Sequence, residues 1–130
     1  MNAREQFLVA VDALNNADVA EMQKLITPDF LFHPIRAPIT GDYVGIEGLE
    51  QFLRDNAETF DRFNAEYDDL REMDDGRLFA SGKVRIRGRG SQVDTFVTSA
   101  GMASFRDGLL AGWHDYGDRE AALAAAGFAE

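Results

Sequence analysis

The chain has 130 residues, 45% of them hydrophobic and 28% charged, which is typical of a single globular domain with a sizeable core. Its formal net charge of −10 repels phosphate backbones and argues against nucleic acid as a partner. It contains no cysteine, which excludes disulfides, thiol nucleophiles and thiolate metal sites.

The first half of the chain predicts helices around one short strand. Apolar residues recur at helical spacing from Phe7 onward, and the sequence NNAD interrupts them once. The Thr27–Pro28 pair should end the second helix, because the residue before a proline is steered away from helical geometry. In chain order, we expect helices over 4–15 and 18–26, a strand FLFHP over 30–34, a loop over 35–45 and a helix over 46–60.

From residue 63 the apolar period changes towards two, which indicates strands. The sequences DDG, GS and RDG are turn signals that divide this region into four strands. The last strand is LLAGWHDY, and the alanine-rich run after it predicts a helix from an Asp118 N-cap to a Gly127 C-cap. This order predicts an α+β domain with helices packed on one face of a curved sheet.

Three stretches of the sequence resemble the SnoaL-like group of the nuclear transport factor 2-like superfamily, whose relatives include limonene epoxide hydrolases and ketosteroid isomerases. They are ALNNADVAEMQKLITPDFLFHP, VGIEGLEQFL and FRDGLLAGWHDYGDREAAL, and they occur in the family's order over nearly the whole chain. The resemblance implies one domain over residues 1–130, a cone-shaped antiparallel sheet wrapped by helices in the order α-α-β-α-β-β-β-β-α. It also implies a deep apolar pocket and a homodimer across the outer sheet face.

Asp115 is the first candidate for chemistry. The resemblance matches it to a carboxylate that cyclases and epoxide hydrolases of this group use inside the pocket. Strand alternation would place Trp113 and Asp115 on the pocket face, together with Leu109 and Ala111. Desolvation beside Trp113 would raise the pKa of the carboxyl and allow proton exchange near neutrality. The alternative is a solvated aspartate at the strand end, or one that caps the following helix.

Alternation sends His114 and Tyr116 to the outer face of the same strand. His33 is the second candidate, since it precedes Pro34 at the position of the proton-shuttling base in the similar isomerases. Its ordinary pKa of about 6.5 suits proton transfer, and the alternative is a half-buried histidine bonded to a loop carbonyl. Ala10 and Gly101 stand where the isomerases carry a tyrosine and an acidic donor, which argues against isomerase chemistry.

Arg85 is a candidate ligand-binding residue with two interpretations. The epoxide hydrolases carry Arg-x-Asp on this strand, whereas this chain has Lys83-Val84-Arg85, so their triad is broken unless Asp94 replaces the missing carboxylate. Arg85 either lies inside the cone, where it would bind an anionic oxygen or hold Asp115 ionised, or belongs to a surface ladder that pairs with acidic neighbours. The surface interpretation is favoured for the rest of that ladder, Arg87 and Arg89. The acidic partners would be residues such as Glu66 and Asp68.

Two further predictions concern the rim of the pocket and the outer face. The loop over 35–45 should lie at the pocket mouth, where Tyr43 would close over a ligand. Phe96, Val97 and Phe105 offer an apolar patch on the outer face through which two chains would form a homodimer.

No metal, cofactor or membrane is expected as part of the function. The two histidines do not have a metal-binding spacing, and no glycine-rich phosphate loop follows a strand. The opening sequence lacks the features of a signal peptide, and no apolar stretch is long enough to cross a membrane, so we expect a cytoplasmic protein. The leading hypothesis is an enzyme that transfers protons on a small apolar oxygenated molecule. The alternative is a non-catalytic ligand-binding or dimeric interaction module.

Overall fold

The computed structural model describes residues 1–35 and 37–128. The chain begins with two helices, α1 (Ala3–Asn15) and α2 (Val19–Leu25). The side chains of Asn2 and Asp18 cap them by accepting hydrogen bonds from the backbone N–H groups of Glu5 and Glu21. The predicted cap at Asp18 is therefore confirmed.

The region between the second helix and the fourth differs from the prediction. The first strand, β1 (Ile26–His33), starts directly after α2 and contains Pro28, where its register with its neighbour shifts. The predicted loop over 35–45 contains a short helix, α3 (Ala37–Thr40), and a two-residue strand, β2 (Tyr43–Val44). Within that predicted loop, Arg36 lies outside the described residues.

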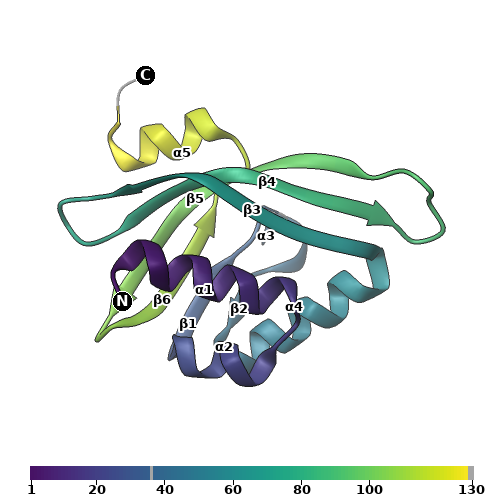
Figure 1. The fold of residues 1–130 in the computed structure, drawn as a ribbon, viewed down its shortest axis with the longest axis horizontal. Coiled ribbons are helices and arrows are strands. Elements are labelled where there is room, and N and C mark those ends of the chain that lie inside the picture. Colours follow the sequence, from purple (N-terminus) through teal and green to yellow (C-terminus); the bar gives the residue numbers. More distant parts are fainter. Residues whose placement is uncertain (36, 129–130) are drawn as a thin grey trace.

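The remaining elements follow the predicted order. They are helix α4 (Gly45–Thr59), strands β3 (Phe60–Glu72), β4 (Leu78–Gly88), β5 (Thr95–Arg106) and β6 (Leu109–Asp115), and helix α5 (Arg119–Ala126). Within the described residues, six strands form one curved sheet in the order β2-β1-β6-β5-β4-β3, and only the β1–β6 pair is parallel. The predicted α+β fold with a curved sheet wrapped by helices is confirmed (Figure 1).

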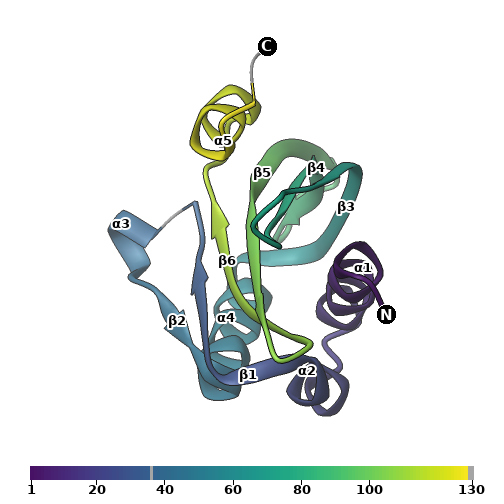
Figure 2. The same ribbon diagram turned by 90° about the vertical axis from the view of Figure 1, so that its left-hand side faces the viewer.

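Helices cover both faces of the sheet rather than one, which corrects the prediction. Helices α1, α2 and α4 lie on the inner face, and α5 lies on the opposite side (Figures 1 and 2). On that outer face, Ala122 and Leu123 of α5 pack against Phe79, Ala100 and Met102. Strand alternation explains this second core, because Phe79 and Met102 point away from the face that their neighbours Leu78 and Ala103 share.

The predicted apolar patch on the outer face is mostly wrong. Phe105 packs against the core of the inner face, and Val97 lines the pocket described below. Phe96 alone of the three is an exposed outer-face residue, and the cations of Lys83 and Arg85 lie 5.0 and 6.0 Å from its ring centre. None of the helices within the described residues is long and apolar enough to cross a membrane.

Candidate functional site

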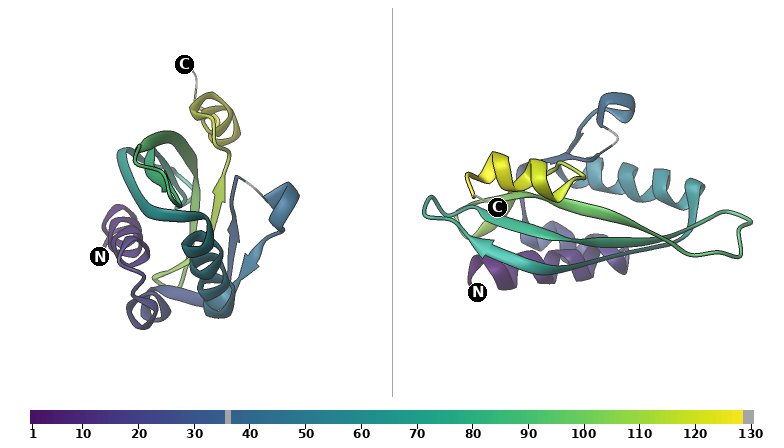
Figure 3. Two further views of the ribbon diagram at one scale, coloured as in Figure 1. Left: turned by 90° about the vertical axis from the view of Figure 1, so that its right-hand side faces the viewer. Right: turned by 90° about the horizontal axis from the view of Figure 1, so that it is seen from above.

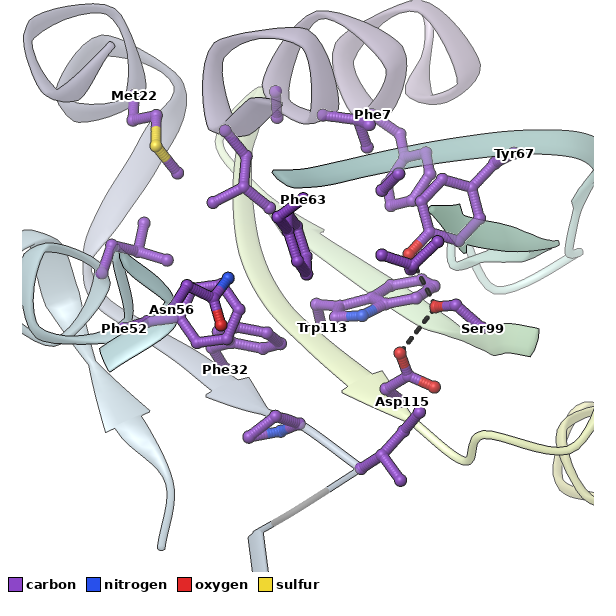
Figure 4. Close-up of a pocket in the computed structure, with 18 of the residues that line it drawn as sticks. Phe7, Met22, Phe32, Phe52, Asn56, Phe63, Tyr67, Ser99, Trp113 and Asp115 are labelled. Atoms are coloured by element: carbon purple, nitrogen blue, oxygen red, sulfur yellow. Dashed lines mark hydrogen bonds between the residues drawn. The ribbon is translucent and has the colours of Figure 1, made fainter. Parts of the chain in front are cut away.

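A cavity of about 370 Å³ lies between the inner face of the sheet and helices α1, α2 and α4. Figure 4 shows how the side chains of these elements converge on it. Two of its lining residues, Ile35 and Val97, are exposed and mark its mouth. Most of the wall is apolar, with aromatic side chains from both the helices and the strands: Phe7, Phe32, Phe52, Phe63, Tyr67 and Trp113.

Two aromatic clusters give the cavity its shape. Phe7, Tyr67 and Trp113 contact one another, with ring centres 5.0 to 5.6 Å apart. On the other wall, Phe52 packs edge-on against Phe32, with ring centres 4.7 Å apart. Such packed rings lose little freedom on ligand binding, so the walls are largely preformed.

Asp115 is the one carboxyl among the described lining residues, and it ends a chain of hydrogen bonds. Its Oδ2 accepts from the Ser99 hydroxyl at 2.6 Å, and its Oδ1 accepts from the backbone N–H of Gly117 at 2.8 Å. The Ser99 oxygen also lies 2.7 Å from the Tyr67 hydroxyl. Because the single Ser99 proton is given to Asp115, Tyr67 donates to Ser99.

The environment of these groups shifts their proton affinities. Burial raises the pKa of Asp115 above its ordinary value of 3.8, while the hydrogen bonds from Ser99 and Gly117 act in the opposite direction. Burial also raises the pKa of Tyr67, and the charge of Asp115 adds to that rise. Tyr67 therefore keeps its proton and acts as a donor, and Asp115 is the cavity carboxyl whose charged form burial disfavours.

Trp113 and Asp115 of strand β6 point into the cavity, as predicted, but Leu109 and Ala111, which were expected on the same face, do not line it. Leu110 lines the cavity in place of Leu109 and Ala111. The cause is a β-bulge, since Ser104 of β5 pairs with Gly112 whereas the next residue, Phe105, pairs with Leu110. The extra residue, Ala111, shifts the alternation by one position towards the start of the strand.

His33 does not reach Asp115, so its predicted place in the site is wrong. Phe32 lines the cavity, and alternation turns His33 to the outer face. There its ring stacks on that of His114, with centres 4.1 Å apart, and its Nδ1 lies 2.6 Å from Oδ1 of Asp42. The outward direction predicted for His114 is confirmed. Its pKa is lowered, first by burial and then by the charge of His33.

Arg85 also lies on the outer face, which excludes the predicted contact with a ligand in the cavity. Its neighbours Val84 and Ile86 line the cavity, whereas its Nε donates to Oδ2 of Asp94 at 2.7 Å. Arg87 donates to the other oxygen of Asp94, also at 2.7 Å. Asp94 therefore serves the surface ladder and cannot replace the missing carboxylate in the cavity.

Arg87 and Arg89 lie on the surface, as the favoured interpretation of the ladder predicted. Their acidic partners differ from the predicted ones. Arg89 pairs with Asp61 at 3.3 Å, and Arg87 with Asp94, in place of Glu66 or Asp68. The strand register explains the choice for Asp94, because the β4–β5 turn brings it back over the arginines.

Tyr43 is a core residue rather than a lid. Its ring is buried against Phe32 and Phe52, and its hydroxyl donates to Oδ2 of Asp55 at 2.7 Å. Within the predicted loop, Ile35 is the residue at the mouth. A β-carbon placed on Gly117 would lie 3.3 Å from Cγ1 of Ile35, so this side chain lies beside the end of the Asp115 strand.

Three polar residues of the cavity escaped the sequence analysis: Asn56, Tyr67 and Ser99. Asn56 had a usable signal, because it follows Leu49 and Phe52 on the buried stripe of α4. Tyr67 and Ser99 come from different strands, and only the pairing of both with Gly82 places them in one row. Among the described residues, no group of three or more His, Cys, Asp or Glu side chains is placed to hold a metal ion.

This fold and cavity agree with a family assignment. The model of the SnoaL-like domain matches residues 8–113, so the chain belongs to that family. No curated protein matches the chain.

Solved structures of similar proteins share the fold at low sequence identity. TerC, co-crystallised with polyporic acid, is 18% identical, with a TM-score of 0.73 over 90% of this chain and 92% of that chain. A putative SnoaL-like polyketide cyclase from Shewanella denitrificans is also 18% identical, with a TM-score of 0.70 over 94% and 96%. A hypothetical protein with a ketosteroid isomerase-like fold from Catenulispora acidiphila, in complex with trimethylamine, is 13% identical, with a TM-score of 0.74 over 99% and 96%.

Proposed function

We propose that this protein catalyses proton transfer on a small, largely apolar, oxygenated molecule bound in the cavity, with Asp115 as the acid–base group. The observation that carries the proposal is the position of Asp115. It is the carboxyl of an otherwise apolar cavity, its pKa is raised by burial, and Ser99 holds one of its oxygens. A carboxyl in such surroundings can gain and lose a proton during a reaction cycle.

A cyclisation of the polyketide type fits this single acid–base group. Asp115 would remove a proton from a carbon next to a ligand carbonyl, and the electron pair left there would form a bond to the carbon of a second carbonyl. The oxygen of that second carbonyl would then take the same proton back from Asp115. The similarity to a putative SnoaL-like polyketide cyclase supports this reaction type.

The aromatic wall supports the proposal because it excludes water. Trp113 would lie against the ligand, and Tyr67 would keep Ser99 oriented towards the carboxylate. Since Ser99 donates to Oδ2, the bonded oxygen is held in place while proton exchange occurs at the carboxyl.

Deuterium exchange tests the proposal without knowledge of the natural substrate. The bicyclic diketone decalin-2,6-dione in heavy water should gain deuterium next to a carbonyl faster in the presence of the protein than in buffer. Asp115→Asn should abolish the increase, because the amide keeps the shape but cannot accept the proton. Asp94→Asn is the control, since that carboxylate lies outside the cavity. Equal exchange with the wild type and Asp115→Asn contradicts the proposal.

We also propose that the protein is a homodimer that associates through the outer face of β1 and β2. Leu31 and Val44 pair across these strands and are 45% and 55% exposed, which is unusual for large apolar side chains in a sheet. Helix α5 packs on β4 and β5 and leaves this part of the face open among the described residues (Figure 3).

A further inference from the structure

The cavity contains a second polar group that neither the aspartate chain nor the fold uses. Asn56 is 7% exposed, and its Nδ2 atom is buried without a hydrogen-bond partner among the described residues. It lines the cavity from the last turn of α4. A buried amide without a partner destabilises the folded state, so its presence calls for a partner that binds there.

Asn56 occupies a helix position at which an apolar residue would be expected. It follows Leu49 and Phe52 on the buried stripe of α4, where an apolar side chain would fill the same space at no polar cost. Figure 4 shows Asn56 beside Phe52 and Phe32, with Trp113 drawn between it and Asp115. The cavity therefore has a donor on its helical side and an acid–base group on its strand side.

We propose that Asn56 binds the ligand by donating a hydrogen bond from Nδ2 to a carbonyl oxygen. This inference deepens the proposed function and rests on it for the identity of the cavity as the ligand site. It defines the ligand class more closely: a mainly apolar molecule with a carbonyl oxygen at one end and the reacting group at the other. A ligand without an oxygen at the helical end would leave the amide unpaired and bind less well for its size.

Two matched probes test this assignment. The ketone 2-decalone and the hydrocarbon decalin share one skeleton and differ in the oxygen that Asn56 would bind. Trp113 is the only tryptophan of the chain and lines the cavity, so its fluorescence reports the binding of either probe. Asn56→Leu should weaken 2-decalone about five- to tenfold, as expected for one hydrogen bond, and leave decalin unchanged. Equal effects on both probes, or no effect on either, would overturn the assignment.

Thermal unfolding of the empty protein separates a ligand-binding role from a structural one. Asn15→Leu is the matched control, because both atoms of that amide bond the backbone of Ala65. It should lower the melting temperature, whereas Asn56→Leu should leave it unchanged or raise it. A fall with Asn56→Leu as large as with Asn15→Leu would make Asn56 a structural residue and overturn the inference.

The inference and the proposed function fail in different ways. Asp115→Asn should keep the preference for 2-decalone over decalin that Asn56 provides, although it loses deuterium exchange. Exchange by the wild type without any effect of Asn56→Leu on the probes refutes only the role of Asn56. An effect of Asn56→Leu on 2-decalone alone, without exchange by the wild type, supports Asn56 and refutes the role of Asp115. If neither probe binds, both are refuted.

Discussion

At the scale of the residue, two aspartates show how position decides chemistry. Asp94 lies on the surface ladder, where hydrogen bonds from Arg87 and Arg85 lower its pKa. Asp115 lies in the cavity, where burial raises its pKa despite the hydrogen bond from Ser99. The ionised form is thus favoured at Asp94 and disfavoured at Asp115, which fits the first to a structural role and the second to proton exchange.

These opposite shifts predict opposite effects on stability. Asp115 keeps its proton to a higher pH in the folded state than in the unfolded state, where its pKa is 3.8. Ionisation of Asp115 therefore destabilises the folded state. This destabilisation is absent below pH 3.8 and reaches its full size above the raised pKa of the folded state. Asp115→Asn should melt at a higher temperature than the wild type at neutral pH, and this gain should vanish in acid. The measurement is thermal unfolding across this pH range.

Asp94→Asn is the matched control, with the reverse sign. Its lowered folded pKa means that ionised Asp94 contributes stability above 3.8, which is lost as the pH falls through the folded pKa. The substitution should lower the melting temperature slightly at neutral pH and have no effect in strong acid. An Asp115→Asn variant that behaves like Asp94→Asn would mean that Asp115 is a stabilising surface-type carboxylate.

At the scale of the element, strands β5 and β6 set the position of Asp115 through a close approach of their backbones. Gly101 pairs with Asp115. A β-carbon at Gly101 would lie 2.1 Å from the carbonyl oxygen of His114 and 3.0 Å from the indole of Trp113. Only glycine allows the two strands to lie this close beside the carboxyl.

Gly101→Ala should therefore destabilise the fold by about 1–3 kcal/mol, as overpacking of a tight site does. It should also change the fluorescence of Trp113, because the indole must move. Gly88→Ala is the control, since a β-carbon there meets nothing within 4 Å. Chemical denaturation followed by tryptophan fluorescence measures both effects. A neutral Gly101→Ala would refute the close approach.

Sequence periodicity predicted most elements because helices and strands leave different apolar spacings, which depend on each segment alone. It did not predict the direction of side chains that depend on a partner strand. The bulge at Ala111 has no local signature, since it exists only relative to Ser104 and Phe105 of β5. The outward turn of His33, by contrast, follows from alternation with Phe32, which lines the cavity, and the match to the base of the isomerases placed His33 wrongly.

The site was predictable only in part, for a related reason. Asp115 and Trp113 are adjacent on one strand, so alternation sufficed for them. The hydrogen-bond chain from Tyr67 to Ser99 spans three strands, and its members meet only because β4 pairs with both β3 and β5. Asn56 could have been identified from the sequence, because it is a polar residue on an otherwise apolar stripe of a helix.

At the scale of the whole molecule, the sheet separates two environments. Helices α1, α2 and α4 lie on its inner face and α5 on its outer face (Figures 1 and 2). The cavity lies on the inner side, while the arginine ladder and the stacked histidines lie on the outer side. Strand alternation produces this division, since adjacent residues of one strand serve opposite faces. Changes on the outer face should thus alter association without altering the cavity.

The proposed dimer provides a test of that separation. Light scattering of the wild type at micromolar concentration should give twice the mass of one chain. Leu31→Glu should give the monomer mass, because it places a charge in the buried interface. Ile39→Glu, at an exposed apolar residue of α3, is the control and should remain dimeric. A wild type that is monomeric at these concentrations, or a dimeric Leu31→Glu, contradicts the interface.

An NMR titration of the side-chain carboxyl carbon of Asp115 tests whether this buried group can exchange protons in its apolar cavity. The predicted midpoint lies above the ordinary pKa of 3.8, because burial disfavours the charge. Ser99→Ala should raise the midpoint further, since it removes a hydrogen bond to the ionised form. A midpoint at or below 3.8 in the wild type would mean that burial does not hold the proton on Asp115 and would refute its proposed role.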